Sequence, residues 1–200
     1  MDSRIVSREI RREVWPILRD HGFQHFTGRR ACRHSPERIW VAEFQSFSSY
    51  FSQVDGCTTF SFAINLAIYI PALADEGRAL PDNPRSYECH IRRKLPKDIV
   101  QANYPRKDIW FVEAGGENLL DVLADARSVI LRDGIVWFRR FDADEEVFHT
   151  LVEENESDQL FGIGARWSPR RKVLIGRFAV STGQEETWPP CAARGRSRGT

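Results

Sequence analysis

The stretch from Cys57 to Ile70 constrains the fold more than any other part of the sequence, because its side chains alternate without a break. One face carries the large apolar residues Phe60, Phe62, Ile64, Leu66, Ile68 and Ile70, and the other carries Thr59, Ser61, Ala63, Asn65 and Ala67. A period of two is that of a β-strand with one apolar face. So long a strand would invite unwanted pairing at a sheet edge, so we place it near the centre of an antiparallel sheet.

Further strands are predicted on both sides of this one. Residues 23–27 and 30–34 flank Gly28 and predict a short hairpin, and residues 38–47 alternate as a third strand. The Ser-rich and aromatic segment 46–56 is then a hairpin loop. Residues 87–95 predict a fifth strand, and the apolar residues 109–112 could form a short sixth one.

Helices are predicted at the two ends of the chain. Residues 3–20 have helical spacing up to a glycine, with a break or kink at Pro16. Residues 119–133 form a second helix that Asp133-Gly134 closes, and 142–154 form an acidic third. After Ser168-Pro169 we expect a last helix over 169–181, although the same residues could also alternate as a strand.

This order predicts an α+β fold with an antiparallel sheet of about five strands. The helices pack on one face of the sheet, the N-terminal helix first and the C-terminal helices last. We expect a single domain over 1–183, with a core at about 8–140 and a helical extension at 141–183, and a disordered basic tail at 184–200.

Composition supports a folded protein with no membrane segment. With 42% hydrophobic residues, the 200-residue chain can bury a sizeable core. The net charge of +1 hides basic and acidic blocks, such as eight acids and no base over 142–158. No secretory signal or membrane span is apparent, and the cysteines form no Cys-x-x-Cys pair. We therefore expect a cytoplasmic protein with reduced thiols.

The polar face of the sheet is the first place to look for chemistry. If the strands pair in sequence order, the polar positions of the third, fourth and fifth strands share one surface: Glu43, Gln45, Ser61, Asn65, His90 and Arg92. Arg92 could clamp an anion, and Glu43 with His90 could act as acid and base. The same residues could equally be solvated, or form a hydrogen-bonded layer beneath a helix.

Other catalytic or metal chemistry has little support in the sequence. Cys32, His34, Cys89 and His90 could be drawn as metal ligands, but their spacing is not that of a structural zinc site, and buried cysteines are the favoured interpretation. There is no nucleophile motif, and Gly162-x-Gly164 lacks the glycines of a nucleotide-binding loop. We expect no metal and no cofactor.

Two surface features suggest macromolecular partners instead. Arg29, Arg30 and Arg33 in the first hairpin, with Phe23 and Phe26 interleaved, could touch nucleic acid, although such aromatic residues more often face the core. The aromatic loop with Phe47, Tyr50 and Phe51 could contact another protein.

One succession of segments resembles a known bacterial family, domain of unknown function 4304, over roughly residues 8–140. The segments are Gly22-Phe23, the basic hairpin, Trp40 to Gln45, Phe60 to Leu66, Cys89 to Arg92 and Asp108 to Trp110. Ala67 and Phe111 stand where the family usually has glycine and tryptophan. The resemblance implies the fold, fixed polar positions at Gln45, Asn65 and Arg92, and a cytoplasmic bacterial origin, but no activity.

The functional expectation is therefore a non-enzymatic binding or protein-interaction domain of an immunity-like or regulatory kind. The alternatives are a hydrolase or nuclease that acts on a phosphate-bearing substrate through Glu43, His90 and Arg92, and a nucleic-acid-binding domain. We expect a protein partner and no membrane, while the oligomeric state stays open.

Overall fold

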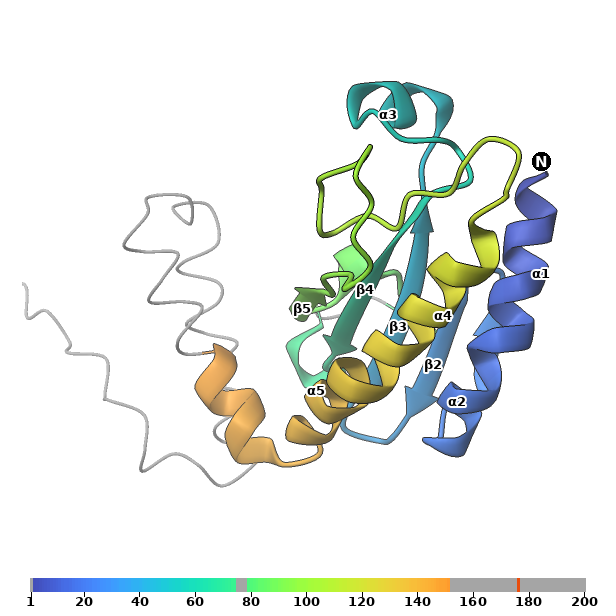
Figure 1. Ribbon diagram of the computed structural model, residues 1–200. Coiled ribbons are helices and arrows are strands. Elements are labelled where there is room, and N and C mark those ends of the chain that lie inside the picture. Colours follow the sequence, from blue (N-terminus) through green and yellow to red (C-terminus); the bar gives the residue numbers. More distant parts are fainter. Residues whose placement is uncertain (1, 75–78, 152–175, 177–200) are drawn as a thin grey trace, which may run out of the picture. The chain divides into compact units, whose positions relative to one another are not determined.

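A computed structural model describes residues 2–74, 79–151 and 176 (Figure 1). The chain divides into two compact units, residues 1–143 and 144–200. In the second unit, residues 144–151 are helical, which is most of the predicted acidic helix. The last residues of that prediction, the helix predicted over 169–181 apart from the helical Gly176, and the basic tail at 184–200 lie outside the described residues.

The first unit is built on a five-stranded antiparallel sheet whose strand order follows the sequence. The strands are β1 (His25–Thr27), β2 (Arg30–His34), β3 (Ile39–Ser46), β4 (Phe62–Tyr69) and β5 (Ile91–Lys94). β4 pairs with β3 and β5 on its two sides. The predicted hairpin and the internal place of the long strand are confirmed, and the order of the strands, which the sequence left open, is that of the chain.

Helices cover one face of this sheet, with α1 (Ser3–Glu13) beside α4 (Leu119–Val129) and α2 (Trp15–Asp20) following α1 (Figure 1). The break between α1 and α2 comes just before Pro16, as the sequence predicts, because proline cannot donate a backbone hydrogen bond inside a helix. Trp15 packs edge-on against Phe44 of β3, with ring centroids 5.5 Å apart. The apolar residues of β3 and β4 that face these helices form the core.

The predicted stop at Gly134 is wrong. After α4 the chain continues through a π-helical turn, η3 (Ile130–Gly134), into α5 (Ile135–Arg140). Gly134 keeps helical backbone angles, and a Cβ built on it would lie 3.5 Å from Leu95 Cδ1 and 3.7 Å from Leu66 Cδ1. These are ordinary contact distances, so Gly134 lies inside a continuous helix at a position with room for a methyl group, and it does not end the helix.

Three other boundaries differ from the prediction. The long strand begins at Phe62, because residues 57–61 form a turn in which the Thr58 hydroxyl accepts the backbone N–H of Ser61 at 3.2 Å. The predicted loop at 46–56 contains helix α3 (Ser49–Val54), which Ser48 caps. The predicted fifth strand begins only at Ile91, since Ser86–Glu88 form the 3₁₀ turn η2.

The predicted sixth strand at 109–112 is reduced to one bridge between Phe62 and Trp110. Ile109, Trp110 and Val112 are nevertheless fully buried, and Trp110 donates its indole N–H to Asp125 of α4 at 2.8 Å. The segment therefore serves as an apolar anchor.

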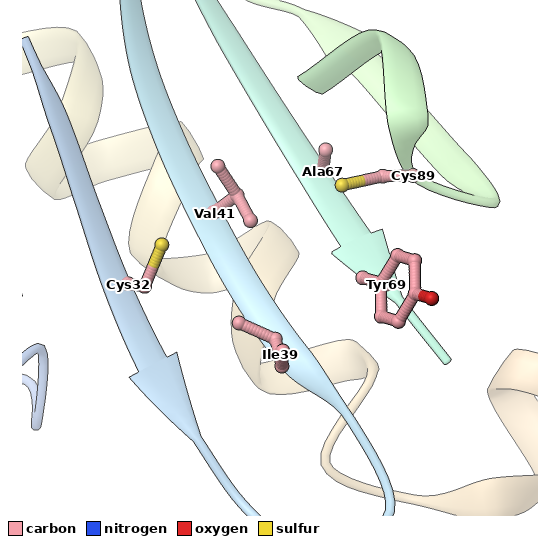
Figure 2. Close-up of a cluster of buried hydrophobic side chains, with 6 residues drawn as sticks. All are labelled: Cys32, Ile39, Val41, Ala67, Tyr69 and Cys89. Carbon is pink, nitrogen blue, oxygen red and sulfur yellow. The ribbon is translucent and has the colours of Figure 1, made fainter. Parts of the chain in front are cut away.

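The second face of the sheet is also covered over part of its area. Cys32, Val41 and Ala67 lie side by side on β2, β3 and β4, in a buried cluster with Ile39, Tyr69 and Cys89 (Figure 2). Cys89 follows η2, and Ala74, which packs against the cluster, follows the 3₁₀ turn η1 (Pro71–Leu73). The connection between β4 and β5 thus covers the face that the sequence left open.

Candidate functional site

A cleft of about 940 Å³ opens at one end of the sheet. Its walls come from the start of α1, the β1–β2 turn at Gly28, the end of β3, and the turn before β4. Its size is that of a small-molecule site. It gathers predicted site residues from three separate hypotheses: Glu43, Gln45, Phe47, Arg29 and Arg30.

Three guanidinium groups line the cleft. Arg29 donates from Nε to Ser7 Oγ at 3.0 Å and from Nη2 to the Ser3 carbonyl at 3.3 Å, which fastens the hairpin to α1. Burial lowers the pKa of Arg29. Arg30 lies 3.7 Å from Glu43 and donates to the Asn83 carbonyl at 2.7 Å. Arg85 is exposed, and no pattern in the sequence predicts that it lies in the cleft.

Glu43 holds the β4–β5 connection on the sheet. Its second carboxylate oxygen accepts the backbone N–H of Ser86 at 2.9 Å. Beside it, Asn83 donates to Thr27 at 2.5 Å and accepts from the Cys32 thiol at 3.3 Å. Glu43 therefore belongs to a hydrogen-bonded layer, and the layer lies under this connection and not under the N-terminal helix.

Neutral and aromatic side chains complete the cleft. Gln45 accepts a hydrogen bond from Asn65 Nδ2 at 2.8 Å, which orients the Gln45 amide at the edge of the cleft. Phe47 and Phe60 are half-buried and line the wall beside α3. The cleft thus places two phenyl rings near three guanidinium groups.

His90 and Arg92 lie elsewhere on the sheet. Glu43 is level with Asn65 and Lys94, whereas Arg92 is level with Val41 and Ala67. His90 lies two residues further along, where its Nδ1 accepts the backbone N–H of Ile70 at 3.0 Å. Two strand spacings and four residues separate Glu43 from His90, roughly 16 Å. The structure does not bring the proposed acid and base together.

Ser61, the remaining polar candidate, is fully buried. Its hydroxyl accepts the backbone N–H of Val112 at 3.1 Å, and it lies 3.1 Å from the Thr58 hydroxyl. It fastens the turn at 57–61.

Helix α3 lies beyond the end of β3, away from the body of the sheet (Figure 1). It carries three large apolar residues on its surface, with exposed fractions of 68% for Tyr50, 58% for Phe51 and 66% for Val54. The rings of Tyr50 and Phe51 meet edge to face at 5.4 Å. We call these three residues the α3 patch.

Polar contacts fix the position of α3. Arg106 pairs with Asp55, the residue that ends the helix, and the Tyr104 hydroxyl donates to the Asp55 carbonyl at 3.0 Å. Arg106 also binds Asp108 at 2.8 Å, and its hydrogen bond to that carboxylate lowers the pKa of Asp108 to about 2. No local pattern in the sequence predicts this anchor, because Arg106 and Tyr104 lie about fifty residues from Asp55.

The three arginines of the nucleic-acid hypothesis do not share one surface. Arg33 points to the helix-covered face, where it pairs with Asp142 at 2.5 Å and lies over the Trp40 ring at 3.9 Å. Phe23 is buried against Phe138, with ring centroids 5.1 Å apart. Strand alternation explains the split, because Arg30 and Arg33 are an odd number of residues apart.

The Cys and His candidates are not arranged as a metal site. Burial raises the pKa of the Cys32 thiol to about 12 and also raises the pKa of Cys89. His34 stacks on His25 with ring centroids 4.3 Å apart. Within residues 2–74 and 79–151, no group of three or more His, Cys, Asp or Glu side chains could hold a metal ion.

The comparison with protein families decides the relationship. Residues 14–140 match the family described as Domain of unknown function (DUF4304). The chain belongs to the DUF4304 family. The match within this DUF4304 protein ends at the last residue of α5 and includes α3, Glu43, Gln45 and Arg85. It leaves out α1, so the Ser3 and Ser7 side of the cleft lies outside the matched region.

No curated protein and no solved structure matches the chain. None of the described helices of this DUF4304 protein is long and apolar enough to cross a membrane.

Proposed function

We propose that this chain is a non-enzymatic binding domain that contacts another protein through the α3 patch. The carrying observation is the exposure of Tyr50, Phe51 and Val54 on one short helix. Aromatic residues of this kind supply much of the binding energy in protein interfaces. Clustered exposed apolar groups on a folded domain are a mark of interaction sites.

The chemistry of α3 indicates the kind of partner. Ser49–Val54 contains no charged residue, so electrostatic attraction to nucleic acid or to a charged surface does not explain the patch. The matching surface is an apolar pocket on a protein. The net positive cleft beside α3 favours acidic residues around that pocket.

The anchoring of α3 supports the same role. Asp55 is held by Arg106 and Tyr104, so the rings sit on a positioned support and not on a free loop. An interface that is ordered before binding loses less entropy on association.

A regulatory or immunity-like role in the bacterial cytoplasm fits this proposal. Cys32, Cys57 and Cys89 are free thiols in the described part of the chain, which suits a reducing compartment.

The proposal is tested by replacing the α3 patch and a matched pair of exposed apolar residues elsewhere. The variants are Tyr50→Ala with Phe51→Ala, and Tyr87→Ala with Val100→Ala, where Tyr87 is 65% and Val100 92% exposed. Wild type is first used for affinity capture in cells, and the candidate partner is then purified and titrated by calorimetry.

We expect the α3 variant to weaken the purified complex by roughly a hundred-fold, about 2.7 kcal/mol, while thermal unfolding stays unchanged. The control pair should bind as wild type does. Equal affinity of the α3 variant and wild type would show that the patch is not the interface.

A further inference from the structure

The cleft between α1, the β1–β2 turn and the end of β3 is not explained by a protein-interaction role for α3. Its charge is the first clue. The carboxylates that line it are Asp2 and Glu43. Asp2 caps α1 by accepting the backbone N–H of Arg4 at 2.8 Å, and Glu43 is already bound to Ser86 and Arg30.

Within the described residues, two of the three guanidinium groups in the cleft, those of Arg29 and Arg85, form no ion pair with a carboxylate. The carboxylate of Glu88 accepts from the backbone N–H of Arg85 at 2.7 Å. Arg29 Nη1 is buried and has no hydrogen-bond partner in the described part of the chain. A partly buried cation without a counter-charge is unfavourable, so an anion in the cleft would stabilise it.

The lining also offers neutral donors and aromatic surface. Thr27, Ser46 and Thr59 bring hydroxyl groups to the cleft, and Phe47 and Phe60 bring half-buried rings. Guanidinium groups bind phosphate through charged, often paired hydrogen bonds, and phenyl rings stack on planar bases. The combination suits a ligand with a phosphate at one end and an aromatic ring system at the other.

From this arrangement we infer that the cleft binds a nucleotide. Its phosphate lies near Arg29, Arg30 and Arg85, and its base lies against Phe47 and Phe60. The volume of about 940 Å³ is large enough for one nucleotide and small for a folded polymer segment. This site is separate from the α3 patch, and the nucleotide inference does not rest on the proposed function.

The test uses the full chain and adenosine monophosphate as the probe. Calorimetry at low salt is run with the nucleotide, with adenosine and with inorganic phosphate. Amide shifts in ¹⁵N-labelled protein locate the binding. The main variant is Arg85→Gln, because Arg85 is exposed. Its matched control is Arg92→Gln, because Arg92 is an exposed arginine of β5 that lies outside the cleft.

We expect the nucleotide to bind saturably and to bind more tightly than phosphate or adenosine. The amide signals that shift should be those of Gly28, Arg29, Phe47 and Phe60. Arg85→Gln should weaken binding by roughly ten-fold or more, since a hydrogen bond to a charged group is lost, whereas Arg92→Gln should change it by less than about two-fold. The Tyr50→Ala and Phe51→Ala variant should bind the nucleotide as wild type does.

Three results would overturn the inference. They are the absence of nucleotide binding at millimolar concentration, equal effects of Arg85→Gln and Arg92→Gln, and phosphate affinity equal to that of the nucleotide. The last would leave no role for the two rings. Because the wild-type shift map needs no variant, the inference stays testable even if a substitution disturbs folding.

Discussion

At the scale of single residues, Thr58 and Ser61 show how two hydroxyl groups end a pattern that apolar alternation alone would continue. Thr58 Oγ1 donates to the Val112 carbonyl at 2.6 Å and accepts from the backbone N–H groups of Phe60 and Ser61. These bonds offer the backbone an alternative to sheet pairing. The strand therefore begins at Phe62, although the side chains before it still alternate.

This role predicts that Thr58→Val destabilises the fold by about 1–3 kcal/mol, because a nearly isosteric side chain leaves the Val112 carbonyl and two N–H groups without their partner. Thr59→Val is the matched control, since no hydrogen bond of the Thr59 side chain occurs among the described residues. Urea unfolding of both variants measures the difference. An equal loss of stability in the two variants would mean that the Thr58 hydroxyl does not stabilise the turn.

At the scale of secondary-structure elements, α3 depends on partners far along the chain. Arg106 forms ion pairs with Asp55, at the end of α3, and with Asp108. Lys94 also pairs with Asp108, at 3.1 Å. The hydrogen bond from Arg106 stabilises the charged form of Asp108. The helix is short and uncharged, so these contacts and its cap at Ser48 replace the burial that longer helices rely on.

The lowered pKa of Asp108 predicts an acid dependence of stability. The carboxylate has a pKa of about 2 when folded, against 3.8 as its ordinary value. The folded state therefore binds this proton less readily, and the stabilisation is present above about pH 4 and is lost as the pH falls through about 2. In urea unfolding between pH 5 and pH 2, the free energy of unfolding should fall more steeply for wild type than for Asp108→Asn.

The control for this measurement is Asp121→Asn, because Asp121 makes no ion pair within the described residues. It should keep the acid dependence of wild type. If Asp108→Asn follows the wild-type curve as well, the ion pair with Arg106 does not contribute to stability in solution.

The helix continues from α4 into α5 through Gly134, and this allows a prediction about that glycine. Gly134 has a φ of −68°, and an added Cβ would meet only ordinary contact distances. Gly134→Ala should therefore raise stability by about 0.5–1 kcal/mol, since alanine loses less backbone entropy in a helix.

Gly22 provides the contrast, because its φ of +84° is a left-handed conformation that alanine adopts at a cost. Gly22→Ala should lower stability by about 1 kcal/mol or more. Thermal unfolding of the two variants compares them directly. A loss of stability in Gly134→Ala would show that the helix has no room for a methyl group over Leu66 and Leu95.

At the scale of the whole molecule, the first unit has a covering on both faces of its sheet. Helices cover one face, and the β4–β5 connection covers much of the other through the Cys32 cluster and the Glu43 layer. Near the end of this unit, Arg38 in the turn between β2 and β3 donates from Nη1 to the Phe141 carbonyl at 2.6 Å. The family match ends at residue 140, close to the boundary after residue 143.

We therefore predict that residues 1–143 fold without the remainder of the chain. The shortened protein should unfold in one cooperative transition and keep the near-ultraviolet circular dichroism of its buried tryptophans. Calorimetry compared with the full chain measures this. A chain ending at residue 120, which lacks most of α4, is the negative control, and similar non-cooperative melting of both shortened proteins would contradict the prediction.

The sequence by itself determined the first hairpin, the existence of five strands and the two faces of each strand, because period-two alternation and glycine turns act over a few residues. It also determined the break at Pro16. Local signals were weaker at Ser48, where a helix cap lies within a Ser-rich segment, and at Gly134, where a residue that often ends helices lies inside a continuous one.

Only the tertiary structure decided where the polar residues meet. Pairing register separated Glu43 from His90, and the β4–β5 connection returned over the sheet to bring Ser86 to Glu43 and Arg85 to the cleft. Alternation specifies a face but not a register, and contacts between segments forty or more residues apart depend on how the whole chain packs.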